Sequence, residues 1–457
     1  MRQRSDAAEN REAILAAAKR LLEHSPRATV TDIAAAAGVS RATVYRHFKS
    51  REVLAAAVAG QAPPARAAVA EPLPAGRLGR RRPVPLEAIN VFDAVPPPAL
   101  PEQLLAEAQR MARVPLALYV ADIDGSHLLR VAGPSRLPER IAAPLAVGPE
   151  LDRAALAELR DRLTSLPGAE IVPLWLRGRA NGVLIALGRP EASLEDLARQ
   201  ASAAITLADR YTDTFARAQR RMQPKAAAEM QQGMLPPRIA RVSGGEVAGN
   251  VLPSYEVAGD WFDVVENVDG IWITVADGLR SATRATAAAA VALGALRAAR
   301  RSGAGVGEAL LVMHATLKEM PGPHAEMTAV AARWDPTAGS ASIVNCGHVP
   351  PIVLPERGRG VPVGRQHGHG LGGRSRPRPQ ETSVRLRPGD RLVLVSDGVV
   401  GRDEGKAGLG VDGLIAAAKG SSAATAAETV REIHSAVLDA SGGELDDDAT
   451  VVCLAVA

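Results

Sequence analysis

The chain has 457 residues, a formal net charge of +4, and 47% hydrophobic against 23% charged residues. This length exceeds what one core organises, so several domains are expected, and the composition excludes wholesale disorder. Two cysteines cannot form a disulfide framework or a cysteine-based zinc module. We find neither an apolar run of about 18 residues nor an apolar leader. These features predict a multidomain cytoplasmic protein without a membrane partner.

Residues 1–60 predict a small all-α domain. Apolar residues recur at helical spacing between 14 and 22, Gly38 ends a second short helix, and Ser40 can cap a third. Two short helices around a tight turn make a helix-turn-helix, whose exposed side chains can contact phosphates and base edges in a major groove. The candidate DNA-binding residues are Ser40, Arg41, Thr43, Tyr45, Arg46 and His47.

This stretch resembles the DNA-binding domain of TetR-type bacterial regulators. The motifs that carry the resemblance are Ile33-Ala34, Gly38-Val39-Ser40, Tyr45-x-His47-Phe48 and Lys49-Ser50-Arg51-Glu52. It implies that the helix from Ser40 to Phe48 is a recognition helix for double-stranded DNA. A helical domain that keeps the fold but binds only protein is the alternative. A Pro- and Arg-rich linker at 61–101 replaces the all-helical dimerisation domain of that family, so dimerisation must come from elsewhere.

Residues 102–222 alternate predicted helices and strands. Strands are expected at 116–121, 128–131, 171–176 and 182–187, followed by a long helix at 193–222. The order resembles an α/β GAF-type sensory domain, which implies a small-molecule ligand of unknown identity; a dimerising spacer that binds nothing is the alternative. Apolar residues recur at three- and four-residue steps along the long helix and predict a two-helix interface, and thus a homodimer.

Four acidic segments stand out in residues 225–457. Asp260 lies in the first, Asp277 and Asp397 each end an apolar strand, and Asp447 and Asp448 begin one. Carboxylates gathered at strand ends repel one another unless cations lie between them, and all-oxygen sites select Mg²⁺ or Mn²⁺. Two such ions can hold and ionise a water for attack on phosphorus. Each segment alone is more simply a turn, but the four together favour a two-metal site.

The order of these segments resembles the SpoIIE-type branch of protein phosphatase 2C-like serine/threonine phosphatases. The matching motifs are Gln231-Gln232-Gly233-Met234-Leu235-Pro236-Pro237, Gly259-Asp260-Trp261-Phe262-Asp263, Asn345-Cys346-Gly347-His348-Val349-Pro350-Pro351, Ser396-Asp397-Gly398-Val399 and Asp447-Asp448-Ala449-Thr450. The resemblance implies an α/β-sandwich, with two antiparallel sheets between helical layers. It also implies hydrolysis of a phosphoprotein, usually a phosphorylated anti-sigma-factor antagonist.

By the same resemblance, Asp277 bridges two Mn²⁺ or Mg²⁺ ions beside the Gly278 carbonyl, and Asp397 and Asp447 are further direct ligands. Asp448 is the neighbour that can exchange roles with Asp447, and Asp260 acts through water. The candidate catalytic residues are therefore Asp260, Asp277, Asp397 and Asp447, and the candidate metal ligands are Asp277, Gly278, Asp397, Asp447 and Asp448. The motif from Asn345 to His348 is expected to build a strand and turn beside the site.

The segment after Asp277 departs from the family pattern. That branch continues with paired glycines, whereas this chain continues Gly278-Leu279-Arg280-Ser281-Ala282, so the residues that permit a tight turn are missing. Arg280 and Arg284 are gained and are candidate substrate-binding residues for a phosphoryl group. An active metal-dependent phosphatase is favoured; the alternative is a TetR-like regulator with a phosphoprotein-binding pseudophosphatase domain. The Gly-, Arg-, His- and Pro-rich stretch 358–379 predicts a mobile loop.

Overall fold

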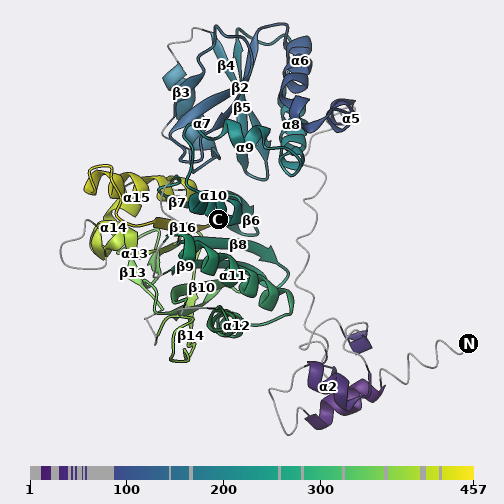
Figure 1. Cartoon of the computed structure of the whole chain (residues 1–457), viewed down its shortest axis with the longest axis vertical. Coiled ribbons are helices and arrows are strands. Elements are labelled where there is room, and N and C mark those ends of the chain that lie inside the picture. The colour runs from purple at the N-terminus through teal and green to yellow at the C-terminus, as the bar shows by residue number, and fades with distance from the viewer. Residues whose placement is uncertain are drawn as a thin grey trace, which may run out of the picture. The chain divides into compact units, whose positions relative to one another are not determined.

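The computed structural model divides into two units, residues 1–79 and 80–457, which are considered separately (Figure 1). It describes residues 12–21, 30–39, 43–44, 47–48, 54, 57–58, 87–143, 146–163, 168–255, 259–278, 282–321, 325–364, 369–401, 408–420 and 425–457, without the side chains of residues 30, 31, 87, 88, 282 and 283. None of the helices in these ranges is both long and apolar enough to cross a membrane.

The N-terminal unit contains the predicted first helices and turn. A helical segment covers 12–21, and α2 covers Val30–Ala36. Gly38 then adopts a φ of +66°, which glycine tolerates far better than other residues, so the predicted turn is confirmed. A small apolar core is formed by Ile14, Ala18, Ile33, Ala34, Val44, Phe48 and Leu54. Among the candidate DNA-binding residues, the half-buried Thr43 and His47 are described, whereas Ser40, Arg41, Tyr45 and Arg46 lie outside the described residues.

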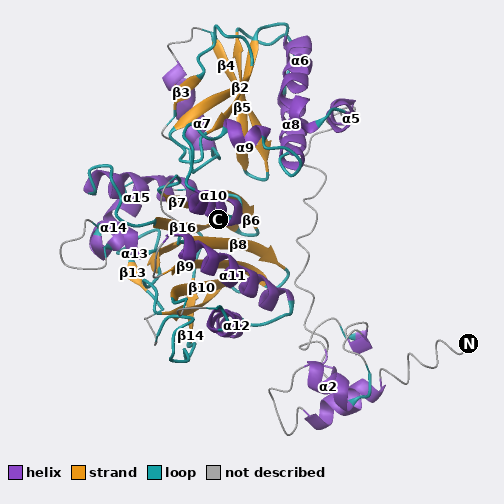
Figure 2. Cartoon of the chain, in the orientation of Figure 1, coloured by secondary structure: helices purple, strands orange, loops and turns teal. Residues whose placement is uncertain are grey.

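The region that follows builds a five-stranded antiparallel sheet with helices on both faces (Figure 2). The strands are β1 (Leu116–Ala121), β2 (His127–Ala132), β3 (Arg140–Ala142), β4 (Ala169–Leu176) and β5 (Arg179–Leu187), in the order β3-β2-β1-β5-β4. One face is covered by α5 (Glu87–Ala94), α6 (Leu100–Ala112, after the 3-10 turn η1 at Pro97–Ala99) and α8 (Glu195–Ala208), and the other by α7 (Arg153–Arg162). The four predicted strands are confirmed.

Two predictions for this region were wrong. The stretch predicted as linker contains α5, because Phe92 gives this helix an apolar anchor in the core of the domain. The helix predicted over 193–222 ends at Ala208, and a short α9 (Thr214–Ala218) follows. The apolar residues of the predicted long helix pack inside their own domain, because α8 covers the sheet and Phe215 of α9 is buried in the same core. The helical spacing therefore does not mark a seam between two subunits.

The C-terminal region has two antiparallel sheets between helical layers, as expected. The first sheet contains β8 (Trp261–Asn267), β9 (Gly270–Gly278), β10 (Met327–Asp335), β11 (Ser340–Cys346) and β14 (Glu381–Arg385), in the order β14-β11-β10-β9-β8. The second contains β6 (Ile239–Val242), β7 (Gly245–Leu252), β12 (Ile352–Leu354), β13 (Val361–Pro362), β15 (Arg391–Val395) and β16 (Ala449–Val456), in the order β13-β12-β15-β16-β7-β6.

Helices cover the outer faces of this sandwich (Figure 1). The first sheet packs against α11 (Ala282–Arg301) and α12 (Val306–Lys318), and the second against α14 (Gly410–Ala418) and α15 (Ala426–Ala440). Because successive side chains of a strand point to opposite faces, Trp261 packs under the helices while Phe262 packs between the sheets. Two shorter helices are α10 (Ala226–Met234), ahead of the sandwich, and α13 (Asp397–Val400), directly after β15.

A buried polar cluster joins the β1–β2 turn to the segment that follows β7. The carboxylate of Asp122 is fully buried; its Oδ2 accepts a hydrogen bond from Arg221 Nε at 3.0 Å, and its Oδ1 accepts one from the Tyr255 hydroxyl. Nearby, Ser254 Oγ donates to the carbonyl of Ile123 at 3.2 Å. Burial raises the pKa of Asp122, while the Tyr255 hydroxyl and the Arg221 charge oppose the rise. The cluster thus fixes the chain a few residues before Gly259.

Replacing Asp122 tests this cluster. Asp122→Ala leaves the Tyr255 hydroxyl and the Arg221 guanidinium without their acceptor, so the free energy of unfolding should fall by about 2 kcal/mol. Urea unfolding of the full chain measures the change. The control is Glu139→Ala, because Glu139 is 90% exposed and its ion pair with Arg130 is screened by solvent. Equal losses in the two variants would contradict the assigned role.

Candidate active site

Antiparallel pairing brings the predicted carboxylates to one end of the sandwich. In the first sheet, Trp261 at the start of β8 pairs with Ala276 near the end of β9, so Asp260 lies beside Asp277. In the second sheet, Val395 at the end of β15 pairs with Val451 near the start of β16, so Asp397 lies close to Asp448. Asp277 lies at the end of β9, as predicted, whereas Asp397 begins α13 two residues after β15 ends, and β16 begins at Ala449, directly after Asp447 and Asp448.

Hydrogen bonds connect the two sheets at this end. Thr450 Oγ1 of β16 donates to Asp260 Oδ2 at 2.5 Å. Asp448 Oδ2 accepts the backbone N–H groups of Gly259 and Asp260 at 2.9 and 3.1 Å. It also accepts Gln231 Nε2 at 2.9 Å, and the same amide nitrogen donates to the carbonyl of Asp260. The position of Asp260 is therefore fixed from the opposite sheet and from α10.

The buried carboxylates act on one another electrostatically. Asp260 and Asp448 are each 1% exposed, and Asp277 is 4% exposed. Burial raises the pKa of Asp260 well above its ordinary value, the charges of Asp277 and Asp448 raise it further, and hydrogen bonds from Ser396 and Thr450 oppose the rise. Burial also raises the pKa of Asp448 to about 7. Placing this much negative charge in a buried site is unfavourable without a compensating positive charge.

The structure distinguishes Asp447 from Asp448. Asp448 is buried, and its Oδ2 accepts three hydrogen bonds that hold the segment carrying Asp260. Asp447 is half-buried, and its Oδ1 accepts the backbone N–H of Asp448 at 3.0 Å. Asp397 is also half-buried and is the first residue of α13. The more accessible carboxylates of Asp397 and Asp447 are thus better placed than Asp448 to reach a ligand.

The chemistry of this site fits a divalent cation. Every candidate donor is an oxygen, and neither Asp260 nor Asp448 has a Lys or Arg within salt-bridge distance in the described part of the chain. The buried Oδ1 of Asp448 also has no hydrogen-bond partner there. Over the same ranges, however, no three His, Cys, Asp or Glu side chains come together closely enough to hold one ion. The donor types therefore match Mn²⁺ or Mg²⁺, while a closed coordination sphere is not formed by these side chains alone.

Three supporting residues were missed from the sequence. Gln231, Ser396 and Thr450 are fully buried polar residues beside the aspartates. Ser396 Oγ donates to the carbonyl of Asp448 at 3.1 Å and accepts the N–H of Thr450 at 2.9 Å. All three lie within the motifs that define the resemblance, next to apolar positions. The signal in the sequence that could have identified them was a polar residue among apolar positions that are expected to be buried.

The motif around Asn345 builds a turn beside β10, as predicted. Asn345 Nδ2 donates to the carbonyls of His348 and Gly364 at 2.9 and 3.3 Å, and its Oδ1 accepts the N–H of His348 at 2.8 Å. His348 Nδ1 is 2.7 Å from Thr328 Oγ1, and Thr328 pairs with Asp277 in the sheet. These contacts give Asn345 and His348 a supporting position behind the strand that carries Asp277.

Of the two candidate arginines, the structure describes Arg284 but not Arg280. Arg284, in the first turn of α11, donates through Nη2 to the carbonyl of Pro321 at 3.0 Å. Arg280 lies outside the described residues, together with Leu279 and Ser281. Asp263, by contrast, points under the helices and pairs with Arg297 and Arg300 at 2.8 and 2.7 Å. That ion-pair cluster attaches α11 to β8, away from Asp260.

Two family models match parts of the chain. Residues 267–457 match Stage II sporulation protein E (SpoIIE), and residues 14–58 match the tetR family of bacterial regulatory proteins. The N-terminal region is therefore similar to the tetR family, which accords with its helix-turn-helix, and the C-terminal region is similar to SpoIIE.

Several solved structures are similar to this chain. The RsbU and RsbW domains of a Mycobacterium tuberculosis protein share 22% identity over 47% of this chain and 61% of that chain, with a TM-score of 0.41. The SiaA-PP2C domain of Pseudomonas aeruginosa shares 16% identity over 50% of this chain and 94% of that chain, with a TM-score of 0.43. The PP2C phosphatase domain and a regulatory fragment of SpoIIE from Bacillus subtilis share 18% identity over 46% of this chain and 61% of that chain, with a TM-score of 0.39. The match thus spans 61% of the mycobacterial and Bacillus chains.

The Gln231 side chain offers a test of the site's support. Gln231→Leu removes both hydrogen bonds of the amide and leaves the Asp448 carboxylate without one of its three donors. We expect the free energy of unfolding to fall by about 1–3 kcal/mol. The matched control is Met230→Ala on the exposed face of the same helix, where the side chain is 45% exposed. Thermal unfolding that is equally affected by both changes would refute the importance of the buried amide.

Proposed function

We propose that the C-terminal domain is a metal-dependent protein serine/threonine phosphatase within a DNA-binding signalling protein. The observation that carries this proposal is the burial of Asp260, Asp277 and Asp448 at one end of the sandwich, where the charges of Asp277 and Asp448 act on Asp260 from two different sheets. A structural role alone does not explain why a fold would bury mutually repelling carboxylates together. A bound cation gives the arrangement its compensating charge.

Residues at the strand ends supply the proposed metal ligands. Asp277, the Gly278 carbonyl, Asp397 and Asp447 would hold two Mn²⁺ or Mg²⁺ ions. When bound, such ions activate water and neutralise charge on the phosphoryl group. Asp448 holds the Gly259–Asp260 segment through its Oδ2.

Asp260 is the proposed proton acceptor. Its Oδ2 is engaged by the Thr450 hydroxyl, so Oδ1 is the atom proposed to take a proton from the attacking water. The bond between phosphorus and the serine or threonine oxygen breaks, this oxygen receives the proton that Asp260 took from water and leaves as an alcohol, and phosphate is the second product.

The other domains complete the proposed protein. The helix-turn-helix is proposed to bind double-stranded DNA, and the middle domain is proposed to be a GAF-like sensor whose ligand is unidentified. A phosphorylated protein, such as an anti-sigma-factor antagonist, is the proposed substrate. We also propose that the chain acts as a homodimer, because a helix-turn-helix usually reads two half-sites.

A second candidate function follows from the segment after Asp277. The glycines of the family pattern are missing there, and no three described acidic or His side chains converge on one point. A domain that binds a phosphoprotein without hydrolysing it would keep the fold and the arginines while losing turnover. In that case the helix-turn-helix would provide the output of the protein.

Phosphate release decides between these two functions. The full chain should hydrolyse p-nitrophenyl phosphate and a phosphoserine peptide in Mn²⁺, and chelator should abolish turnover. Asp277→Asn and Asp397→Asn should each lower kcat by at least about a hundredfold, because each removes a ligand charge. Circular dichroism checks that both variants remain folded.

The surface variant Arg385→Ser serves as the control for this assay, because Arg385 is exposed near the opposite end of β11, where it pairs with Ser340. Full activity in both aspartate variants would reject the metal-ligand assignment. Metal binding without turnover by the wild-type chain would favour the pseudophosphatase.

Salt-dependent DNA binding tests the N-terminal domain. Arg46→Ala should weaken binding to an operator selected from genomic fragments by about tenfold, because it removes a contact of the proposed recognition helix. A gel-shift titration at several salt concentrations measures both the affinity and its salt slope. Lys19→Ala changes an exposed cation outside that helix and serves as the control. Equal affinity of the Arg46 variant and the wild type would argue against this helix as the DNA-reading element.

A further inference from the structure

The stretch predicted as a mobile loop contains an ordered platform in residues 369–379, and that prediction was wrong for these residues. Leu371 and Met327 exchange two backbone hydrogen bonds, of 2.6 and 3.0 Å. Gly372 donates its N–H to His314 Nδ1 at 3.1 Å. Gly372 has a φ of +77°, and a Cβ there would lie 1.9 Å from the carbonyl oxygen of Ala325, so only glycine fits. Backbone pairing and close packing therefore hold the platform against β10 and α12.

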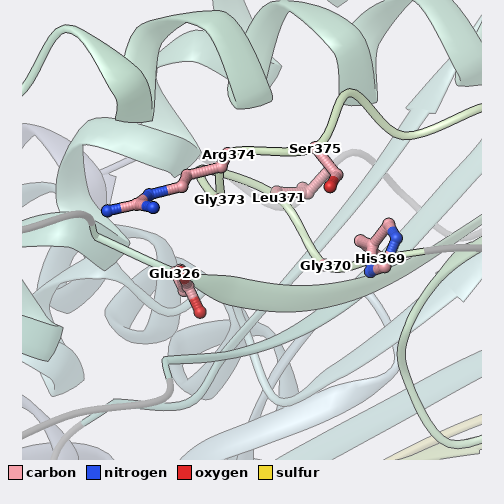
Figure 3. Close-up of a pocket in the computed structure, with 7 residues that line it drawn as sticks. All are labelled: Glu326, His369, Gly370, Leu371, Gly373, Arg374 and Ser375. Atoms are coloured by element: carbon pink, nitrogen blue, oxygen red, sulfur yellow. The ribbon is translucent and has the colours of Figure 1, made fainter.

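This platform adjoins the candidate active site. Met327 pairs with Leu371 on one side and with Gly278, the residue after Asp277, on the other. Neighbouring strands are about 4.8 Å apart, so the backbone of Leu371 is roughly 10 Å from that of Gly278. A cavity of about 290 Å³ opens at this point. It is lined by Glu326, His369, Gly370, Leu371, Gly373, Arg374 and Ser375 (Figure 3).

The platform carries several exposed cations. Arg374, Arg376 and Arg378 are all exposed, and they occupy every second position, while Pro377 between the last two is buried. Lys318, at the end of α12, is exposed as well. Burial and then the positive charges of Lys318 and Arg376 lower the pKa of His314, whose Nδ1 accepts the N–H of Gly372. None of the four forms a salt bridge with an acidic side chain in the described ranges.

We propose that Lys318, Arg374, Arg376 and Arg378 form a docking surface for an acidic segment of the phosphoprotein substrate. This inference rests on the proposed phosphatase function and specifies the class of substrate that the site takes. The bound segment would lie along the platform and extend toward Gly278, so that a phosphorylated serine or threonine a few residues away reaches the strand ends. A span of roughly 10 Å corresponds to about three extended residues.

The geometry favours a peptide chain as the occupant. Arg376 and Arg378 are exposed on either side of the buried Pro377, and Arg374 precedes them in a bend, so three guanidinium groups face solvent within five consecutive residues. Guanidinium groups bind carboxylates and phosphates through paired hydrogen bonds, which suits Asp, Glu and phosphorylated side chains. The anchored backbone adds to this effect, because less flexibility is lost when the partner binds.

Peptide binding tests the docking surface without relying on turnover. The full chain carrying Asp277→Asn is titrated, in Mn²⁺, into two fluorescent phosphoserine peptides that have either Asp and Glu or Ser and Gly around the phosphoserine. The wild-type platform should bind the acidic peptide more tightly, and added salt should reduce that preference. Arg374→Ser/Arg376→Ser/Arg378→Ser should weaken acidic-peptide binding by about tenfold while reducing neutral-peptide binding far less.

A matched triple variant controls for the change in charge. Arg357, Arg385 and Arg387 are exposed and lie away from the platform, so replacing all three with Ser should preserve the preference for the acidic peptide. Equal affinities of the wild type for the two peptides, or equal losses in the two triple variants, would overturn the proposal. So would a short DNA duplex that displaces the acidic peptide and loses its own binding in the Arg374–Arg378 variant, since the surface would then serve nucleic acid.

Turnover measurements separate this inference from the proposed function. If the wild-type chain hydrolyses no phosphopeptide but binds the acidic one through these arginines, the phosphatase proposal fails and the docking surface stands. If it hydrolyses acidic and neutral peptides with the same kcat/KM, and the platform variant does not change that ratio, the phosphatase stands and the docking surface is rejected.

Discussion

The burial of several carboxylates at one end of a sandwich is the constraint on which the rest of the C-terminal domain depends. Asp260, Asp277 and Asp448 would separate if their strands were free, because each is buried and raises the cost of ionising its neighbours. Strand pairing within each sheet and the hydrogen bonds of Gln231 and Thr450 between elements prevent that separation. The fold thus holds an unfavourable charge arrangement that a compensating positive charge would stabilise.

The support for this arrangement extends beyond the sandwich. The helix α10, which carries Gln231, is attached to the end of the middle domain by the ion pair between Arg220 and Glu229, at 2.7 Å. Tyr255, which lies in the chain just before Gly259, is held by Asp122 of the middle domain. Two elements that position Asp260 are therefore in direct contact with the middle domain. A change in the β1–β2 turn therefore has a short physical route to the candidate site.

Local patterns predicted some features well and others poorly, for identifiable reasons. The turn at Gly38 and the aspartates at strand ends depend on a few adjacent residues, so they could be located in the sequence. The prediction of one long helix over 193–222 was wrong because helical spacing indicates an apolar face but not what covers it. Phe215 packs in the core of its own domain. The prediction of a mobile loop was wrong for residues 369–379 because the glycines were interpreted as a sign of flexibility. Gly372 is instead required by close packing against Ala325.

The sequence by itself determined which chemical groups are present and the order in which they come. It placed oxygen donors beside strands, a helix-turn-helix ahead of them, and arginines at alternating positions in 374–378. The tertiary structure decided which of these groups meet. Gln231 and Asp448 are separated by more than two hundred residues, yet they share a hydrogen bond of 2.9 Å. Partners of this kind follow from the register of strands and the packing of helices, and no local spacing records them.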